Sequence, residues 1–160
     1  MPNALAELAL GQLDRLEEFE KKRKEIIGIY QRELMTGRIL KQVQNDDKNV
    51  PLLRYSILVE NPDELRKFAK KRDIILGNWY SNVIDPKGTD FGKIGYQKGS
   101  CPAAEEIAGK IVNLPTYPRM SQKDAMMVVG IIKEYFNDVA SQGHPLLKPF
   151  AKAQGQGRGL

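Results

Sequence analysis

Hydrophobic residues recur at three- and four-residue steps along residues 2–34. The stripe consists of Leu5, Ala9, Leu13, Leu16, Phe19, Ile27, Tyr30 and Leu34. Because this period places side chains on one side of a helix, the sequence predicts a single long helix over 2–34. Leu8 and Leu10 lie off the stripe, so the first half of this helix is apolar on several sides. We therefore expect a partner chain, or further parts of a larger protein, to cover residues 4–16.

Strand patterns follow this helix. Residues 52–59 alternate between apolar and polar side chains, which predicts a half-buried strand with an inward face of Leu53, Tyr55, Ile57 and Val59. The shorter apolar runs at 38–43, 73–79 and 112–115 are also interpreted as strands, and the polar run 44–49 as a turn.

Two short helices have recognisable start signals. Asn61 is a candidate N-cap with Pro62 at the first helical position, and Pro102 begins the second helix. The buried residues expected for the first are Leu65, Phe68 and Ala69. Those expected for the second are Ile107, Ala108 and Ile111.

The last helix is predicted over about 122–140. Ser121 and Asp124 have the spacing of a capping box. The apolar stripe consists of Ala125, Val128, Val129, Ile132, Phe136 and Val139. Met126 and Met127 are interpreted as core filler.

The resulting order of elements predicts an α+β fold. We expect a small, mostly antiparallel sheet with helices packed on one face, formed by a single domain over 1–140. Residues 141–160 show no period and are interpreted as a flexible tail. The glycine-rich stretch 85–101 is predicted to be a mobile loop, and the pattern leaves open whether it contacts a ligand or is an inert excursion.

The charge of the chain permits nucleic-acid binding without favouring it. The net charge is +5 and the isoelectric point about 9.3, but the basic residues alternate with glutamates on predicted helices. Nucleic acid is therefore not an expected partner. No apolar run approaches a membrane span and no signal peptide is recognisable, so we expect a cytoplasmic protein without membrane contact.

Motifs that carry catalysis by themselves are missing from the sequence. There is no phosphate-binding loop, dinucleotide fingerprint, zinc-protease motif or nucleophile elbow. Cys101, the single cysteine, is interpreted as a helix cap rather than a nucleophile, and the single His144 lies in the predicted tail. We expect no metal site, and we assign no catalytic residue to this chain.

Both ends of the predicted domain resemble the sugar aminotransferases named for DegT, DnrJ, EryC1 and StrS. The opening MPNALAELALGQLDRLEEFEKKRKEIIGIYQREL is similar to the long helix of that family, through Met1, Ala6, Ala9, Gln12, Leu13, Arg23 and Tyr30. The phrase SCPAAEEIAGKIVNLPTYPRMSQKDA is similar to its closing segment, through Cys101, Pro102, Glu105, Glu106, Leu114, Pro115, Pro118 and Ser121. Tyr117 stands at a position where many members have a histidine or an aromatic residue.

The resemblance implies the C-terminal small domain of a pyridoxal-phosphate (PLP) enzyme of fold type I. Members aminate nucleotide-linked keto-sugars for the biosynthesis of sugars and cell-surface polysaccharides. Their cofactor lysine belongs to a large domain, so we expect this chain to bind no PLP and to be inactive alone. The expected partners are that large domain, or a second copy of the chain through the first helix. The resemblance also implies that Trp79, Tyr80, Tyr96 and Lys98 face the nucleotide-sugar, although Trp79 also fits a plain core or sheet-edge aromatic.

Two other functional classes remain open. A non-catalytic basic α+β module with a regulatory or RNA-binding role fits the charge, but the strands lack paired surface aromatics. A helical interaction protein built on 2–34 would need a sustained heptad, and the stripe drifts instead.

Overall fold

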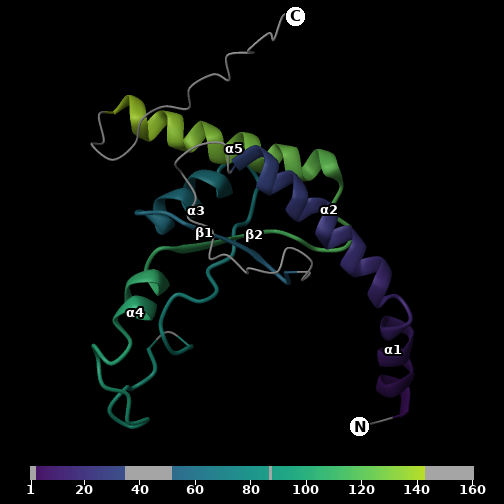
Figure 1. Ribbon diagram of the computed structural model, residues 1–160, viewed down its shortest axis with the longest axis horizontal. Helices are drawn as coiled ribbons and strands as arrows, with labels where there is room; N and C mark the ends of the chain where they lie inside the picture. The colour runs from purple at the N-terminus through teal and green to yellow at the C-terminus, as the bar shows by residue number, and fades with distance from the viewer. Residues whose placement is uncertain (1–2, 35–51, 87, 143–160) are drawn as a thin grey trace, which may run out of the picture.

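The computed structural model describes residues 3–34, 52–86 and 88–142. The elements of this part are α1 (Asn3–Leu13), α2 (Leu16–Leu34), β1 (Tyr55–Leu58), α3 (Pro62–Lys70), α4 (Pro102–Ala108), β2 (Ile111–Leu114) and α5 (Gln122–Ser141). Figure 1 shows α2, α3 and α5 grouped above the two strands, with α4 and the preceding loop below them. This is the α+β class that the sequence predicts.

The strands β1 and β2 pair antiparallel, from Tyr55 opposite Leu114 to Leu58 opposite Ile111. A third segment adds one bridge, in which Gly77 and Asn113 exchange backbone hydrogen bonds of 2.9 and 3.1 Å. The predicted strand at 73–79 is therefore reduced to this bridge.

The strand predicted over 52–59 is shorter than expected. Tyr55, Ile57 and Val59 are buried as predicted, but Leu53 is 65% exposed because it precedes the paired residues. The predictions for 38–43, 44–49 and most of the tail 141–160 fall outside the described residues.

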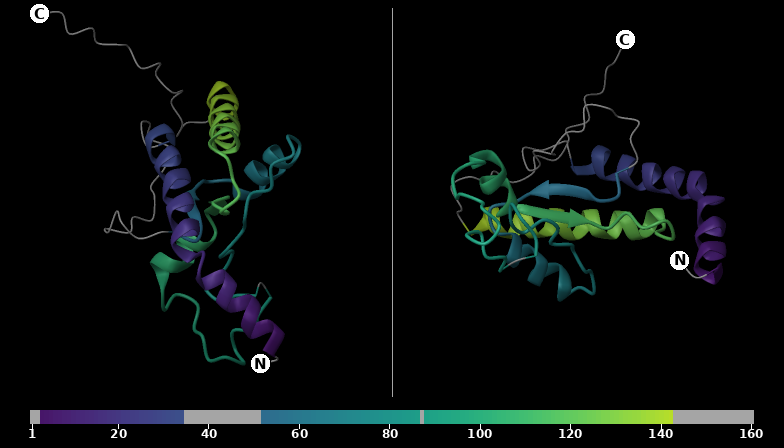
Figure 2. Two further views of the ribbon diagram at one scale, coloured as in Figure 1. Left: turned by 90° about the vertical axis from the view of Figure 1, so that its right-hand side faces the viewer. Right: turned by 90° about the horizontal axis from the view of Figure 1, so that it is seen from below.

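The helices α2, α3 and α5 form one layer over the strand pair, and the two views of Figure 2 show this layer edge-on and from below. The largest fully buried side chains between them are Tyr30, Tyr55, Ile26, Leu34, Ile57, Leu65, Leu114, Ile132, Val112 and Val129. Two polar contacts fix α2 within this layer. The Tyr30 hydroxyl donates to the carbonyl of Pro115 at 2.8 Å, and Lys133 on α5 pairs with Glu33 at 2.8 Å.

The prediction of a single helix over 2–34 is wrong, because the structure has two helices there. The chain turns at Asp14 and Arg15, where the Arg15 amide donates to Gln12 in place of the carbonyl four residues back. Only α2 packs on the core, through Ile26, Ile27, Ile29, Tyr30 and Leu34, whereas α1 has no buried residue. Because α1 buries no residue in the described part, no core contact holds it in line with α2 (Figure 1).

The last helix confirms its predicted start. The Ser121 hydroxyl accepts from the Asp124 amide at 3.1 Å, and the Asp124 carboxylate accepts from the Ser121 amide at 2.9 Å. Met126 and Met127 are not core filler, since they are 47% and 49% exposed. At 100° per residue they lie about 100° and 200° around the helix from the buried Ala125.

Two details of the shorter helices also differ from expectation. The Asn61 side chain caps no amide of α3, although Pro62 stands at its first turn as predicted. Ile111 belongs to β2 and not to α4, because α4 ends at Ala108, just before Gly109.

Candidate functional site

The glycine-rich loop is tied to α4 by one carboxylate. Glu105 Oε1 accepts hydrogen bonds from the Tyr96 hydroxyl at 2.7 Å and from the Gly99 amide at 2.6 Å. The bond from Tyr96, followed by that from Gly99, lowers the pKa of the Glu105 carboxyl, and the same carboxylate raises the pKa of Tyr96. The Phe91 ring packs edge-on against Tyr96 with centroids 5.2 Å apart. These contacts join the loop to the first turn of α4.

A pocket of about 270 Å³ lies between this loop and α4. Ser81, Phe91, Tyr96, Lys98 and Glu105 line it together with the end of α4. Tyr96 and Lys98, two of the four predicted site residues, are therefore brought together in one pocket. The Tyr96 hydroxyl is already engaged, whereas Lys98 is exposed at the rim.

A second, more polar hollow of about 560 Å³ adjoins the first and shares Ser81 with it. Glu60, Glu64, Arg66 and Lys67, around the start of α3, contribute most of its charge. The two hollows together form one surface between α3, α4 and the loop.

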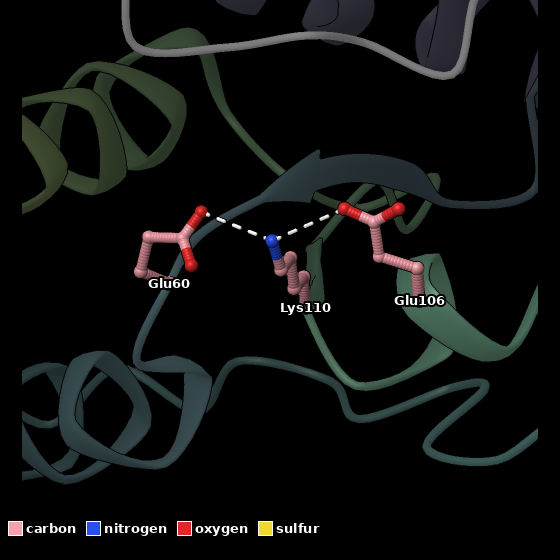
Figure 3. Close-up of polar contacts among 3 residues, drawn as sticks. All are labelled: Glu60, Glu106 and Lys110. Atoms are coloured by element: carbon pink, nitrogen blue, oxygen red, sulfur yellow. Dashed lines mark hydrogen bonds and ion pairs between the residues drawn. The ribbon is translucent and has the colours of Figure 1, made fainter. Parts of the chain in front are cut away.

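Lys110 stands at the edge of this surface between two carboxylates (Figure 3). Its Nζ lies 3.2 Å from Glu60 and 3.4 Å from Glu106. These partners, Glu60 first, raise the pKa of Lys110 and hold it as a cation. Lys110 therefore links the end of β1 to α4 and has no free amine for a nucleophilic role.

The described lysines do not fit the linkage to a PLP cofactor. A lysine that forms an imine needs a desolvated site or a cationic neighbour that lowers its pKa. Lys110 and Lys133 are paired with glutamates, and the other described lysines are exposed. No lysine in the described ranges is buried in a pocket.

Trp79 and Tyr80 lie outside both pockets. They are 51% and 58% exposed, and their rings stack with centroids 5.7 Å apart. The guanidinium of Arg54 lies 4.3 Å from the centroid of the Trp79 ring. Trp79 is therefore not a core aromatic but part of an exposed stack of one cation and two rings.

Two residues that contact the predicted site residues were not predicted from the sequence, namely Glu105 beside Tyr96 and Arg54 beside Trp79. Glu105 stood out only as an acid in the first turn of a helix. Nothing in the spacing relates Arg54 to Trp79, because the bridge between Gly77 and Asn113 brings them together in the fold.

Two classes of site are not found in the part of the chain that the structure describes. No group of three or more histidine, cysteine, aspartate or glutamate side chains there is placed to hold a metal ion. None of the helices described has the length and apolar character to cross a membrane.

Comparison with known proteins identifies relatives for most of the chain. The model of the DegT/DnrJ/EryC1/StrS aminotransferase family matches residues 1–133. GDP-perosamine synthase from Escherichia coli is 23% identical over 145 residues, which cover 86% of this chain and 37% of that protein. The Pleiotropic regulatory protein of Geobacillus stearothermophilus is 24% identical over 140 residues, covering 88% of this chain and 37% of that protein.

The solved structures show the same fold. A putative sugar aminotransferase from Streptococcus pneumoniae in its apo form matches with a TM-score of 0.77 and 20% identity, over 89% of this chain and 37% of that chain. The chain thus spans about 37% of the length of the curated relatives that it matches. The match over 1–133 nevertheless covers most of its residues, and the chain belongs to the DegT/DnrJ/EryC1/StrS aminotransferase family.

Proposed function

We propose that residues 1–140 form the C-terminal small domain of a PLP-dependent sugar aminotransferase. The observation that carries this proposal is the family match over residues 1–133. Solved relatives include a PLP form of the Streptococcus pneumoniae protein. The domain closes over an active site whose cofactor lysine belongs to a large domain, and the exposed or ion-paired state of the described lysines supports this division.

The substrate that we infer is a nucleotide-linked keto-sugar. The name of one relative, GDP-perosamine synthase, supports a nucleotide-sugar class. Lys98 offers an exposed cation for a phosphate at the rim of the loop pocket, and Tyr80 offers an exposed ring face. PLP, when held by the large domain, supplies the electron sink for amino transfer. The part of this chain is to bind and orient the sugar nucleotide and to exclude water.

Complementation tests this function directly. The chain is co-expressed with the PLP-binding large domain of a family member. We expect glutamate-dependent amination of a nucleotide-linked keto-sugar that neither part performs alone. The Lys98→Met variant should raise KM with little change in kcat, since Lys98 is assigned to binding. An assembled pair without transaminase activity would contradict the proposal.

The absence of a cofactor lysine has its own test. The purified chain is incubated with PLP and reduced with borohydride, and its adducts are located by mass spectrometry. We expect only scattered, substoichiometric labelling of exposed lysines, because the described lysines are either exposed or paired with glutamates. A stoichiometric adduct on one lysine would show that this chain holds the cofactor itself.

The exposed stack of Arg54, Trp79 and Tyr80 supports a second candidate, a regulatory or RNA-binding module. Aromatic and guanidinium planes of this kind stack with unpaired bases. Trp79 is the single tryptophan, so its fluorescence reports this surface alone. Quenching by single-stranded RNA, but not by a nucleotide-sugar in the assembled enzyme, would favour the module. The reverse result would favour the aminotransferase.

A further inference from the structure

The face of the strand pair that points away from the helix layer of Figure 1 carries a buried amide. Ser56 on β1 and Asn113 on β2 lie opposite each other on this face, because Tyr55 and Ile57, the neighbours of Ser56, point into the core. Nδ2 of Asn113 donates to Ser56 Oγ at 2.8 Å. Asn113 is only 3% exposed, and its Oδ1 atom has no hydrogen-bond partner among the described residues. A donor that reaches this buried oxygen therefore gains a favourable hydrogen bond.

The guanidinium group of Arg54 lies near this oxygen without bonding to it. A Cβ added to Gly77 would lie 3.4 Å from Asn113 Oδ1 and 3.5 Å from Arg54 Nη1. Because glycine has no Cβ, no side chain of residue 77 fills the space that borders both atoms. A change of the Arg54 rotamer can therefore bring the donor to the acceptor.

In the structure the guanidinium instead covers the ring of Trp79, 4.3 Å from the ring centroid. Arg54 forms no hydrogen bond or ion pair with any described residue, so this ring contact is what holds its side chain. A cation over an exposed ring is held weakly, whereas a planar base that stacks on an aromatic side chain contributes more. Trp79 is half exposed, and its ring is open to such a ligand once the guanidinium moves away.

We propose that Arg54 is a gate on the ring face of Trp79. A planar ring that stacks on Trp79 displaces the guanidinium, which turns and donates from Nη1 to Oδ1 of Asn113. The exchange replaces one ring contact with another and supplies the buried oxygen with its donor, so Arg54 is not left without a partner. A ligand without a planar ring cannot make this exchange, and Arg54 thereby determines which ligands the stack accepts. The ring is the base of the nucleotide-linked sugar, and for this identity alone the inference rests on the proposed function.

A double-mutant cycle tests the exchange. The probe is adenosine, an uncharged nucleoside, and its binding to the full chain is followed by the fluorescence of Trp79, the single tryptophan. Asn113→Ala should weaken binding about fivefold, because the displaced guanidinium then has no acceptor. In the Arg54→Met background the same substitution should change the affinity by less than about twofold, since no guanidinium is left to move. A purely structural role of Asn113 would weaken binding equally in both backgrounds.

Asn113→Asp provides a second variant that preserves the shape of the side chain. Its carboxylate can accept from both the Ser56 hydroxyl and Arg54, so it should hold the guanidinium off the ring before any ligand arrives. Acrylamide should then quench Trp79 more strongly in the free chain, and adenosine should bind about threefold more tightly. The matched control is Arg32→Met, which removes an exposed guanidinium from α2 and should leave quenching and affinity unchanged.

Three results would each overturn the gate. They are a wild-type chain that binds no adenosine, an equal effect of Asn113→Ala in the two Arg54 backgrounds, and unchanged quenching of Trp79 in Asn113→Asp. The proposed function is tested separately, because amination by the assembled enzyme enters none of these measurements. A gate that behaves as expected, in a chain whose assembled enzyme aminates no sugar, would overturn only the assignment of the ring to a nucleotide-linked sugar.

Discussion

The rings of Tyr30 and Tyr55 lie side by side in the core with centroids 5.3 Å apart, and their hydroxyl groups differ in hydrogen bonding. Both side chains are fully buried. The Tyr30 hydroxyl donates to the carbonyl of Pro115 at 2.8 Å, whereas that of Tyr55 has no partner among the described residues. Burial raises the pKa of both phenols, that of Tyr55 to about 12. Both therefore stay protonated over the ordinary pH range, and only one contributes a hydrogen bond.

This pair provides a matched test of the core. Tyr30→Phe should lower the free energy of unfolding by about 1–2 kcal/mol, because the carbonyl of Pro115 loses its donor. Tyr55→Phe removes a buried hydroxyl that has no partner, so it should be neutral or slightly stabilising. Urea denaturation of both variants measures the difference. Equal losses in the two would contradict this assignment of the hydrogen bond.

A second matched pair concerns two glycines. A Cβ on Gly77 would lie 3.1 Å from Cβ of Asn113, at the bridge beside β2, whereas a Cβ on Gly130 of α5 would meet nothing within 4 Å. Gly77→Ala should therefore destabilise the domain by about 1–2 kcal/mol. Gly130→Ala should stabilise it by about 0.5–1 kcal/mol, because alanine is the better helix former. Thermal unfolding measures whether each substitution raises or lowers the stability of the domain. If Gly77→Ala were stabilising, the bridge between Gly77 and Asn113 would not be tightly packed.

The helix caps allow a third comparison. Ser121→Ala removes the hydroxyl that accepts from the Asp124 amide and donates to the Asp124 carboxylate, and it should lower the free energy of unfolding by about 1 kcal/mol. Asn61→Ala at the start of α3 removes no capping bond and should change stability by no more than about 0.5 kcal/mol. Chemical denaturation distinguishes them. A larger loss at Asn61 would show a cap in solution that the structure lacks.

The helices that pack on the sheet could be predicted from the sequence because each buries a continuous stripe. The spacing from Ala125 to Phe136 located α5, and Pro62 and Pro102 located the starts of α3 and α4. The bend at Asp14 could not be foreseen in this way. The apolar stripe continues from α1 into α2 without a break at Asp14. The bend instead reflects that α2 packs on the core whereas α1 buries no residue.

The candidate site was less predictable than the fold. Tyr96 and Lys98 lie in one pocket, but the partner that orients Tyr96 is Glu105, on a different element. Trp79 and Tyr80 form a stack with Arg54 outside that pocket. Contacts of this kind join segments through the tertiary fold, and local periodicity contains no information about them.

The contact between Tyr96 and Glu105 makes the order of the loop dependent on pH. Because the pKa of folded Glu105 is lowered, its contribution is complete above the pKa of the unfolded chain and is lost as the pH falls through the folded value. Amide protection at Gly99 should therefore be constant from neutral pH down to the ordinary range of a glutamate and decline below it. In Tyr96→Phe, which removes the largest cause of the shift, NMR titration should show the pKa of Glu105 returning toward its ordinary value. Protection of Gly99 should then decline at higher pH than in the wild type.

Lys98→Met is the control for this titration. Lys98 also lowers the pKa of Glu105, but through a charge interaction that is the weakest of the causes. Its removal should therefore move the titration of Glu105 less than Tyr96→Phe does, and added salt should reduce the difference from wild type, since the two groups are exposed. If Lys98→Met shifted the titration more than Tyr96→Phe, long-range charge rather than the hydrogen bond would order the loop, and Tyr96 would be free to turn its hydroxyl toward a ligand in the pocket.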